Sequence, residues 1–466
     1  MRSEIGGRPL LAASLALAAG ITALLHPLNL LFLPILLYFC GKKIPALIAA
    51  CLGFLIGLLL GPANVNATAS AGWSAIGTVA TIPNLVSHGE SFLFQTDNET
   101  VLVNLGGRQT LALGETLELS GVLAPIESVR LQGFALGGIS GQVSVSPQNL
   151  HILAKAPVWF DLANRWRSSF LYENETSLNA HQAALVNALC FASARDLSKQ
   201  TREDLSRVGV AHVLSVSGLQ VFLLAFLIQF LLSQLPISRG VQVLVVTLAL
   251  AFCATASGLH PATIRAVVMA VLTLAAYLFR REPDLLSALG LGAVATLIWQ
   301  PWSVFTPGFQ FSYVVVAALS LFWQRMQSSR EDKPMKRVRR RLLQVVSMSF
   351  VATVAVAPLT AYHFGVVSLI SPVSNLLVSP ALPFIILVSM VAWPIGFVTP
   401  SIQAGLLKIV VGPLASWILM VTSAFGNQSW CAISWPPFNP YWIAVYYGGL
   451  LLLWQKTWRP RRDSNA

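Results

Sequence analysis

Four polar stretches interrupt the apolar second half of the chain, and they carry the amide, hydroxyl, imidazole and guanidinium groups that could bind or pass a polar solute. They are Gly209–Val221, Gly258–Ala266, Pro307–Tyr313 and Pro358–Leu377. An unsatisfied polar group in lipid costs several kcal/mol, so these groups are expected to face protein or water. The candidate path residues are His212, Ser215, Ser217, Gly218, Gln220, Arg265, Gln310, Ser312, Tyr362, Ser371 and Asn375.

The segment after residue 370 gathers polar residues on one helical face and surrounds them with prolines. The two sets are Ser371, Ser374, Asn375 and Ser379, and Pro372, Pro380 and Pro383. Broken helices of this kind line cavities in transport proteins, whereas single hydroxyls often join neighbouring helices. We interpret Asn375 with its prolines as cavity-lining and the single serines as helix contacts.

Arg265 has two interpretations that the sequence leaves open. An arginine inside a membrane helix is a functional-site hypothesis by default. Its predicted place in the first turn of a helix also allows the side chain to snorkel to the outer interface. His212 stands at a similar outer end, where an ordinary hydrogen-bonded histidine is the alternative to a role in transport.

The motifs of several enzyme classes are absent from the sequence. It contains no GxxxxGK(S/T) phosphate loop, no GxSxG and no histidine or cysteine cluster with metal-ligand spacing. Five scattered carboxylates before residue 130 are more consistent with a solvated surface than with an acidic catalytic set: Asp97, Glu99, Glu115, Glu118 and Glu127. We therefore expect no enzymatic activity, no metal and no cofactor.

The composition indicates a polytopic α-helical membrane protein, because 55% of the residues are hydrophobic and only 10% are charged. Three apolar runs lie within residues 1–61, and nine more follow from residue 211. Basic residues fall in every second connection, and eight of them cluster between residues 325 and 341 as a cytoplasmic topology anchor. This pattern predicts about twelve spans with both termini in the cytoplasm.

Between the two apolar regions, residues 62–156 are expected to form a small β-barrel domain of OB type outside the membrane. Five short β-rich runs separated by Gly, Pro and Asn support this prediction: 73–82, 91–96, 99–105, 116–123 and 142–153. Residues 157–208 read as an amphipathic helical connection. The predicted channel domain then covers residues 209–458, and residues 459–466 form a cytoplasmic tail.

Taken together and in this order, the four polar stretches resemble the ComEC competence family of DNA-uptake channels. His212–Val221 is similar to the family's HLLxxSGLHV pattern, and Gly308–Tyr313 to its GFQ(L/F)S(F/Y) pattern. Pro261–Ala266 and Pro358–Asn375 match two further elements. Gln220 replaces the second histidine of the first pattern, and Pro307 stands where an acidic residue is common. Many members also carry a C-terminal metallo-β-lactamase-like domain, which we do not find in this sequence.

The resemblance implies passage of single-stranded DNA across the cytoplasmic membrane of a bacterium. It further implies a DNA receptor outside, and a cytoplasmic helicase or strand-binding protein; the oligomeric state is not indicated. Basic residues of the outside region are the candidate DNA contacts, with Trp159 and Trp166 among them: Arg108, Arg130, Lys155, Arg165 and Arg167. The alternatives are a permease for a small polar or anionic solute and a non-conducting membrane scaffold.

Overall fold

The computed structural model describes most of the chain from residue 71 onward. The described residues are 13–18, 71–86, 89–97, 99–107, 109, 111–124, 139–191, 193, 196–214, 218–278, 285–299, 303–304, 306–326, 334–439 and 441–457. The predicted N-terminal spans therefore lie outside the described residues, apart from a helical stretch at 13–18. The predicted tail at 459–466 also lies outside them.

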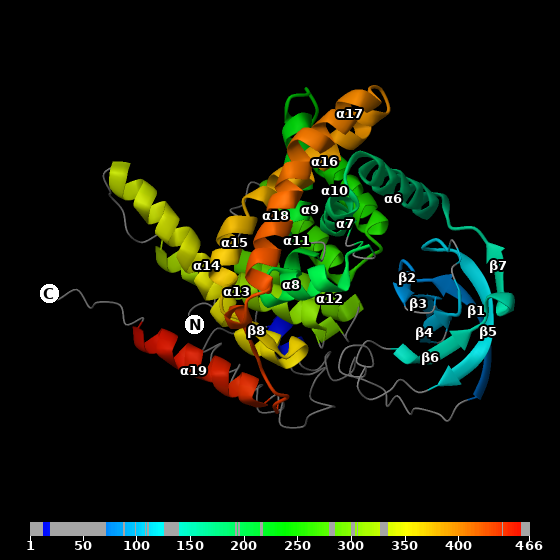
Figure 1. The fold of residues 1–466 in the computed structure, drawn as a ribbon, viewed down its shortest axis with the longest axis horizontal. Helices are drawn as coiled ribbons and strands as arrows, with labels where there is room; N and C mark the ends of the chain where they lie inside the picture. The colour runs from blue at the N-terminus through cyan, green and yellow to red at the C-terminus, as the bar shows by residue number, and fades with distance from the viewer. Residues whose placement is uncertain are drawn as a thin grey trace.

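A closed β-barrel forms the first described domain, at the right of Figure 1. Its strands are β1 (Ala71–Val79), β3 (Gly89–Gln95), β4 (Thr100–Leu105), β5 (Thr116–Ala124) and β6 (Ile139–Val145). They pair in the ring β1-β3-β4-β6-β5, and β5 closes it by pairing with β1. The β4–β6 pair is parallel, and the other pairs in the ring are antiparallel. The predicted five-stranded barrel is confirmed.

Two further strands extend the sheet outside this ring. β2 (Asn84–Val86) pairs with β3, and β7 (Leu150–Ala154) pairs with β5. The predicted run 142–153 thus belongs to two strands, separated by the short 3-10 helix η3 (Pro147–Asn149). Pro147 has no N–H to donate to a ladder, which is consistent with the break at this position.

Alternating apolar residues fill the barrel. Phe92 and Phe94 on β3, Val101 and Val103 on β4, and Leu117 on β5 are each at most 2% exposed. Their spacing of two puts them on the inner face of the pleated strands. The interior is therefore a packed core that holds the strands in register.

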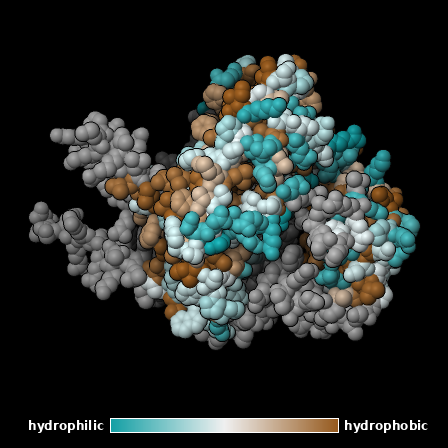
Figure 2. Space-filling model, viewed as in Figure 1, coloured by the Kyte–Doolittle hydropathy of each residue, from teal (hydrophilic) through white to brown (hydrophobic). Residues whose placement is uncertain are grey.

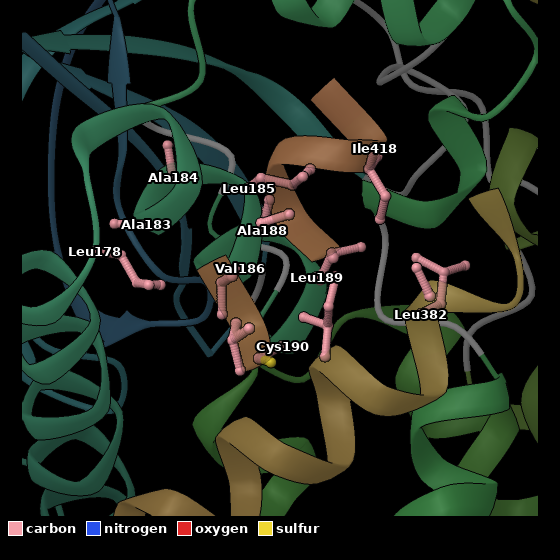
Figure 3. Packing of buried hydrophobic residues seen from close by; sticks show 14 of the residues in the cluster. Leu178, Ala183, Ala184, Leu185, Val186, Ala188, Leu189, Cys190, Leu382 and Ile418 are labelled. Carbon is pink, nitrogen blue, oxygen red and sulfur yellow. The ribbon is translucent and has the colours of Figure 1, made fainter. Parts of the chain in front are cut away.

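Three helices connect the barrel to the apolar region: α6 (Val158–Ser177), α7 (Ala180–Phe191) and α8 (Lys199–Arg207). α7 departs from the amphipathic expectation, because every residue from Ala183 to Phe191 is buried. Figure 3 shows Leu185, Leu189 and Cys190 of this helix among side chains such as Leu382 and Ile418. α7 is therefore a core helix around which other helices pack.

The remaining helices follow the predicted apolar runs. They are α9 (Gly218–Ser233), α10 (Arg239–Ala256), α11 (Pro261–Leu278), α12 (Leu285–Trp299), α13 (Pro307–Met326), α14 (Pro334–Phe364), α15 (Ser371–Val378), α16 (Ala381–Gly396), α17 (Pro400–Leu406), α18 (Gly412–Gly426) and α19 (Tyr441–Thr457). The π-helical turn η6 (Leu407–Val411) joins α17 to α18. A two-stranded antiparallel sheet of β8 (Val366–Ser368) and β9 (Ala432–Ser434) joins the segments that follow α14 and α18.

Several of these helices are suited to cross a membrane. Four described stretches are long and apolar enough: Arg239–Ala256, Val346–Phe364, Ser371–Gly396 and Pro400–Gly426. Four shorter apolar stretches lie in α9, α11, α12 and α13. The prediction of about twelve spans is not confirmed within the described part of the chain. Figure 2 shows hydrophobic surface over α14 and α15, and hydrophilic surface over α6 and α8.

The barrel contacts the helices at two loops. Gly114, at φ 86°, lies against Phe160 of α6, and Asn164 of α6 donates a hydrogen bond to the Leu113 carbonyl at 3.2 Å. Gly258, also at φ 86°, follows α10 and lies against Ile82 of the barrel. A Cβ atom at Gly258 would lie 2.7 Å from the Ile82 side chain, so this approach requires glycine.

Candidate functional site

The first and fourth polar stretches cross at Gly209. This residue has φ 79°, and a Cβ atom there would lie 2.6 Å from Ser371 Cβ and 3.0 Å from Ser368 Cβ. The buried Ser374 hydroxyl donates to the Val208 carbonyl at 2.6 Å. Glycine supplies both the positive φ and the missing side chain that this crossing needs. The crossing fixes the start of the first stretch against α15.

The polar face of α15 is used in two ways. Ser371 and Ser374 are buried, and Thr353 of α14 donates to the Ser371 hydroxyl at 3.3 Å. Half-buried Asn375 donates to Ser371 Oγ at 3.2 Å, and Ser379 is exposed at the end of the helix. The two serines thus join elements, as the sequence favours for single hydroxyls, whereas Asn375 is half-buried and bonds within its own helix.

Arg265 joins the second stretch to the third. Its side chain is 1% exposed, and Nη2 donates to the Gly308 carbonyl at 2.6 Å. The guanidinium carbon lies 5.6 Å from the ring centre of Phe309 and 6.0 Å from that of Tyr313. Both distances are within the range of cation–π attraction. The side chain of Arg265 therefore packs inward between α11 and α13 and does not extend along the surface of its helix.

A second polar contact joins the third stretch to the fourth. Gln310 Oε1 of α13 lies 2.8 Å from His363 Nε2 of α14, and Gln310 Nε2 donates to the Val304 carbonyl at 3.0 Å. Around this pair, Phe311 stacks with Phe364 at 5.8 Å between ring centres. A hydrogen-bonded amide–imidazole pair thus sits among aromatic rings, half-buried between two apolar helices.

The remaining path candidates are dispersed. Tyr362 contacts the ring of Phe438, and Ser312 is half-buried on α13. Gly218 is exposed at the start of α9, and His212 lies in the 3-10 turn η4 (Ala211–Leu214) before it. Ser215 and Ser217 lie outside the described residues. The structure therefore does not bring all eleven candidates into one cluster.

Gln220, which replaces the family's second histidine, is 6% exposed. It lines a small, mainly apolar cavity together with Cys190, Cys253 and Met390. The cavity lies between α7, α9, α10 and α16. The amide at this position therefore faces a tightly packed part of the helical core.

The outside basic candidates differ in how accessible they are. Lys155 is exposed, and the exposed Arg165 pairs with Asp161 at 2.7 Å. Arg167 is half-buried on α6, and its Nη2 donates to Ser193 Oγ at 3.4 Å. Arg108 and Arg130 lie outside the described residues.

Arg167 also acts on the second polar stretch. Burial, and then the positive charge of Arg167, lower the pKa of His260, the residue that precedes α11. His260 is therefore neutral near pH 7. The positive charge of Arg167 on α6 therefore acts at the start of α11. Arg265 lies about one helical turn further along α11.

The two tryptophans of α6 take part in packing. Trp166 contacts the rings of Phe191, Phe252 and Trp393 at 5.2–5.5 Å between centres, and the Trp159 indole donates to Thr255 Oγ1 at 3.0 Å. They hold α6 on α10 and α16. Trp166 is therefore half-buried against three aromatic rings of the helical core.

Sequence reasoning missed three residues of these contacts. His363, Phe309 and Tyr313 lie inside the polar stretches but were not chosen as candidates. The helical spacing of Phe309 and Tyr313, four residues apart, was the available signal. Within the described ranges, no three His, Cys, Asp or Glu side chains gather as a metal-ligand set.

Comparison with known proteins relates these contacts to a family. The model of the family described as "Competence protein" matches residues 189–460, which include all four polar stretches. "ComE operon protein 3" of Bacillus subtilis strain 168 is 27% identical over 208 residues, covering 45% of this chain and 26% of that protein. The "Uncharacterized protein YcaI" of Escherichia coli K12 is 23% identical over 341 residues, covering 64% of this chain and 43% of that protein.

The chain thus spans less than half the length of both relatives. No solved structure matches it. The family match covers more than half of the chain and includes the Gly209–Ser371 crossing, the Arg265 contacts and the Gln310–His363 pair. The chain belongs to the competence protein family.

Proposed function

We propose that this protein conducts single-stranded DNA across the bacterial cytoplasmic membrane during natural competence. The observation that carries the proposal is the chain of polar contacts between apolar helices. Arg265 joins α11 to α13, and the Gln310–His363 pair joins α13 to α14. Polar groups of this kind are costly in lipid and mark solute paths in membrane proteins. In this proposal the protein performs no covalent chemistry.

The barrel supports the proposal as the place that first meets the strand. Of the five ring strands counted along the sequence, the third (β4) and the fifth (β6) pair in parallel. This strand order fits an OB-type barrel. OB barrels bind single strands by combining a basic groove with stacking side chains. We place this domain, residues 62–156, outside the membrane, with the helical connection 157–208 leading to the channel domain 209–458 and both termini in the cytoplasm.

Electrostatics sets the requirements for transport. An inside-negative potential opposes each entering negative charge by about 2.3 kcal/mol per 100 mV. A partner must therefore supply the driving force, and a cytoplasmic helicase or strand-binding protein would do so after an outside receptor delivers the DNA. Arg167 and Arg265 offer positive charge at the start of α11. Lys155 and Arg165 offer exposed charge before it.

The experiment is deletion of the gene, with complementation by the intact gene. We expect deletion to abolish transformation and the arrival of labelled DNA in the cytoplasm, while binding of DNA to the cell surface is kept. Undiminished DNA arrival would refute the proposal. A permease would instead show loss of uptake of a small solute with normal DNA arrival, and a scaffold would show loss of a partner protein from the membrane.

A further inference from the structure

Arg265 is a buried cation that makes no ion pair with any residue that the structure describes. The ion pairs among the described residues are Arg165–Asp161 and Lys199–Glu203, both on exposed helices. The only hydrogen bond of the Arg265 side chain within the described part of the chain is the one to the Gly308 carbonyl. A buried charge without a counter-charge is strongly unfavourable unless something compensates it. Compensation within the described residues comes from the Gly308 carbonyl and the rings of Phe309 and Tyr313, none of which carries a negative charge.

The donors that remain free on Arg265 have a definite geometry. Nε and Nη1 are buried and make no hydrogen bond with the described residues. A guanidinium has five N–H groups in a rigid fork, and Gly308 accepts from Nη2 alone. Nη2 carries two hydrogens, and the Gly308 carbonyl accepts one of them. The second Nη2 hydrogen still lies parallel to an N–H of either Nε or Nη1, so one pair of parallel donors remains. Phe309 and Tyr313 lie within cation–π distance of the guanidinium.

The ligand that fits such a fork is an oxyanion. Arginine binds phosphate and carboxylate through two parallel N–H···O bonds, which lysine cannot do. Arg265 lies four residues beyond Pro261, the first residue of α11, which is about 6 Å along the helix axis. Arg167 acts on His260 at that same helix start. Two positive positions thus follow one another from the barrel side of α11 into the helical region.

We propose that Arg265 is a phosphate-binding position for the DNA strand inside the competence domain, where its free fork holds one backbone phosphodiester as the strand passes. This inference rests on the proposed function. It assigns a specific chemical role to one residue, namely recognition of backbone charge without recognition of base sequence.

The test compares charged and uncharged strands on the purified full chain in phosphatidylcholine nanodiscs. The probes are a fluorescein-labelled oligothymidylate and the same oligomer with a neutral methylphosphonate backbone, and binding is measured by anisotropy. The variants are Arg265→Lys and Arg265→Met, with Lys199→Gln as the exposed control. We expect both Arg265 variants to bind the charged strand about tenfold to a hundredfold more weakly. Binding of the neutral strand should stay unchanged, and the control should resemble wild type.

A thermal measurement separates this role from a structural one. An uncompensated buried charge is destabilising, so an apolar side chain of similar size in its place should not lower the stability. Arg265→Met should therefore keep or raise the melting temperature of the protein while losing the preference for the charged strand. A lower melting temperature with equal loss of both strands would make Arg265 structural and overturn the inference.

The source of the phosphate is tested in the same assay. Phosphatidylglycerol in the nanodisc could compete with the labelled strand in wild type but not in Arg265→Lys. This result would assign the site to a lipid headgroup and overturn the strand assignment. Competition by inorganic phosphate at physiological concentration would likewise favour a free ion. If wild type binds neither oligomer, the proposed function fails first. If wild type prefers the charged strand and Arg265→Lys keeps that preference, only the role of Arg265 fails.

Discussion

The replacement Gly209→Ala tests whether the first and fourth polar stretches meet as described. The residue has φ 79°, and a left-handed conformation costs a non-glycine residue about 1–2 kcal/mol. The new Cβ would lie 2.6 Å from Ser371 Cβ and 2.7 Å from Ser371 Oγ, closer than side chains can pack. Overpacking of this kind costs about 1–3 kcal/mol. The sum predicts a free energy of unfolding lower by about 2–5 kcal/mol.

The matched control is Gly240→Ala, at the start of α10, where a Cβ atom would meet nothing within 4 Å. This change should be neutral or stabilise the helix by about 0.5 kcal/mol. Unfolding by SDS titration in mixed micelles, with immunoblots of the membrane fraction for abundance, measures both variants. Equal stability of the two variants would refute the crossing at Gly209.

Three further changes test other contacts. Ser374→Ala removes a buried hydrogen bond of 2.6 Å and should destabilise the protein by about 1–3 kcal/mol. The control Ser423→Ala, at an exposed hydroxyl, should change stability by less than about 0.5 kcal/mol. Equal effects of the two changes in SDS titrations would contradict this prediction. Gln310→Leu and His363→Leu should be non-additive by about 1 kcal/mol in a double-mutant cycle, and additivity would show that the pair is not formed. Gly258→Ala should loosen the barrel from α10 and speed proteolysis of the connection, and unchanged cleavage would argue against that contact.

The barrel was predictable because its strands alternate apolar and polar residues between turn residues. Phe92 and Phe94, two residues apart, both point into the core. Closure of the ring was not predictable, because the pairing of β1 with β5 and the parallel pairing of β4 with β6 join segments far apart in the chain. Such pairing depends on the whole sheet and leaves no local pattern.

The helices were predictable as apolar runs, but their environment was not. α7 has a composition that suits either a surface or a core helix, and only the packing of α16 and α18 around it shows that it is buried. The contact between Gln310 and His363 joins residues 53 positions apart. Sequence placed both residues in polar stretches, yet their meeting depends on how α13 and α14 pack.

In the proposed function, the polar contacts between apolar helices border the path of the DNA strand. Photo-crosslinking from a strand stalled during uptake tests this most directly, with a photoreactive phenylalanine placed in turn at Gln310, Tyr362 and Asn375. Phe226, which is 58% exposed on the outer side of α9, serves as the control position. We expect crosslinks at the three polar positions and background signal at Phe226. Crosslinks of equal strength at Phe226, or none at the three polar positions while a strand is stalled in the membrane, would contradict it.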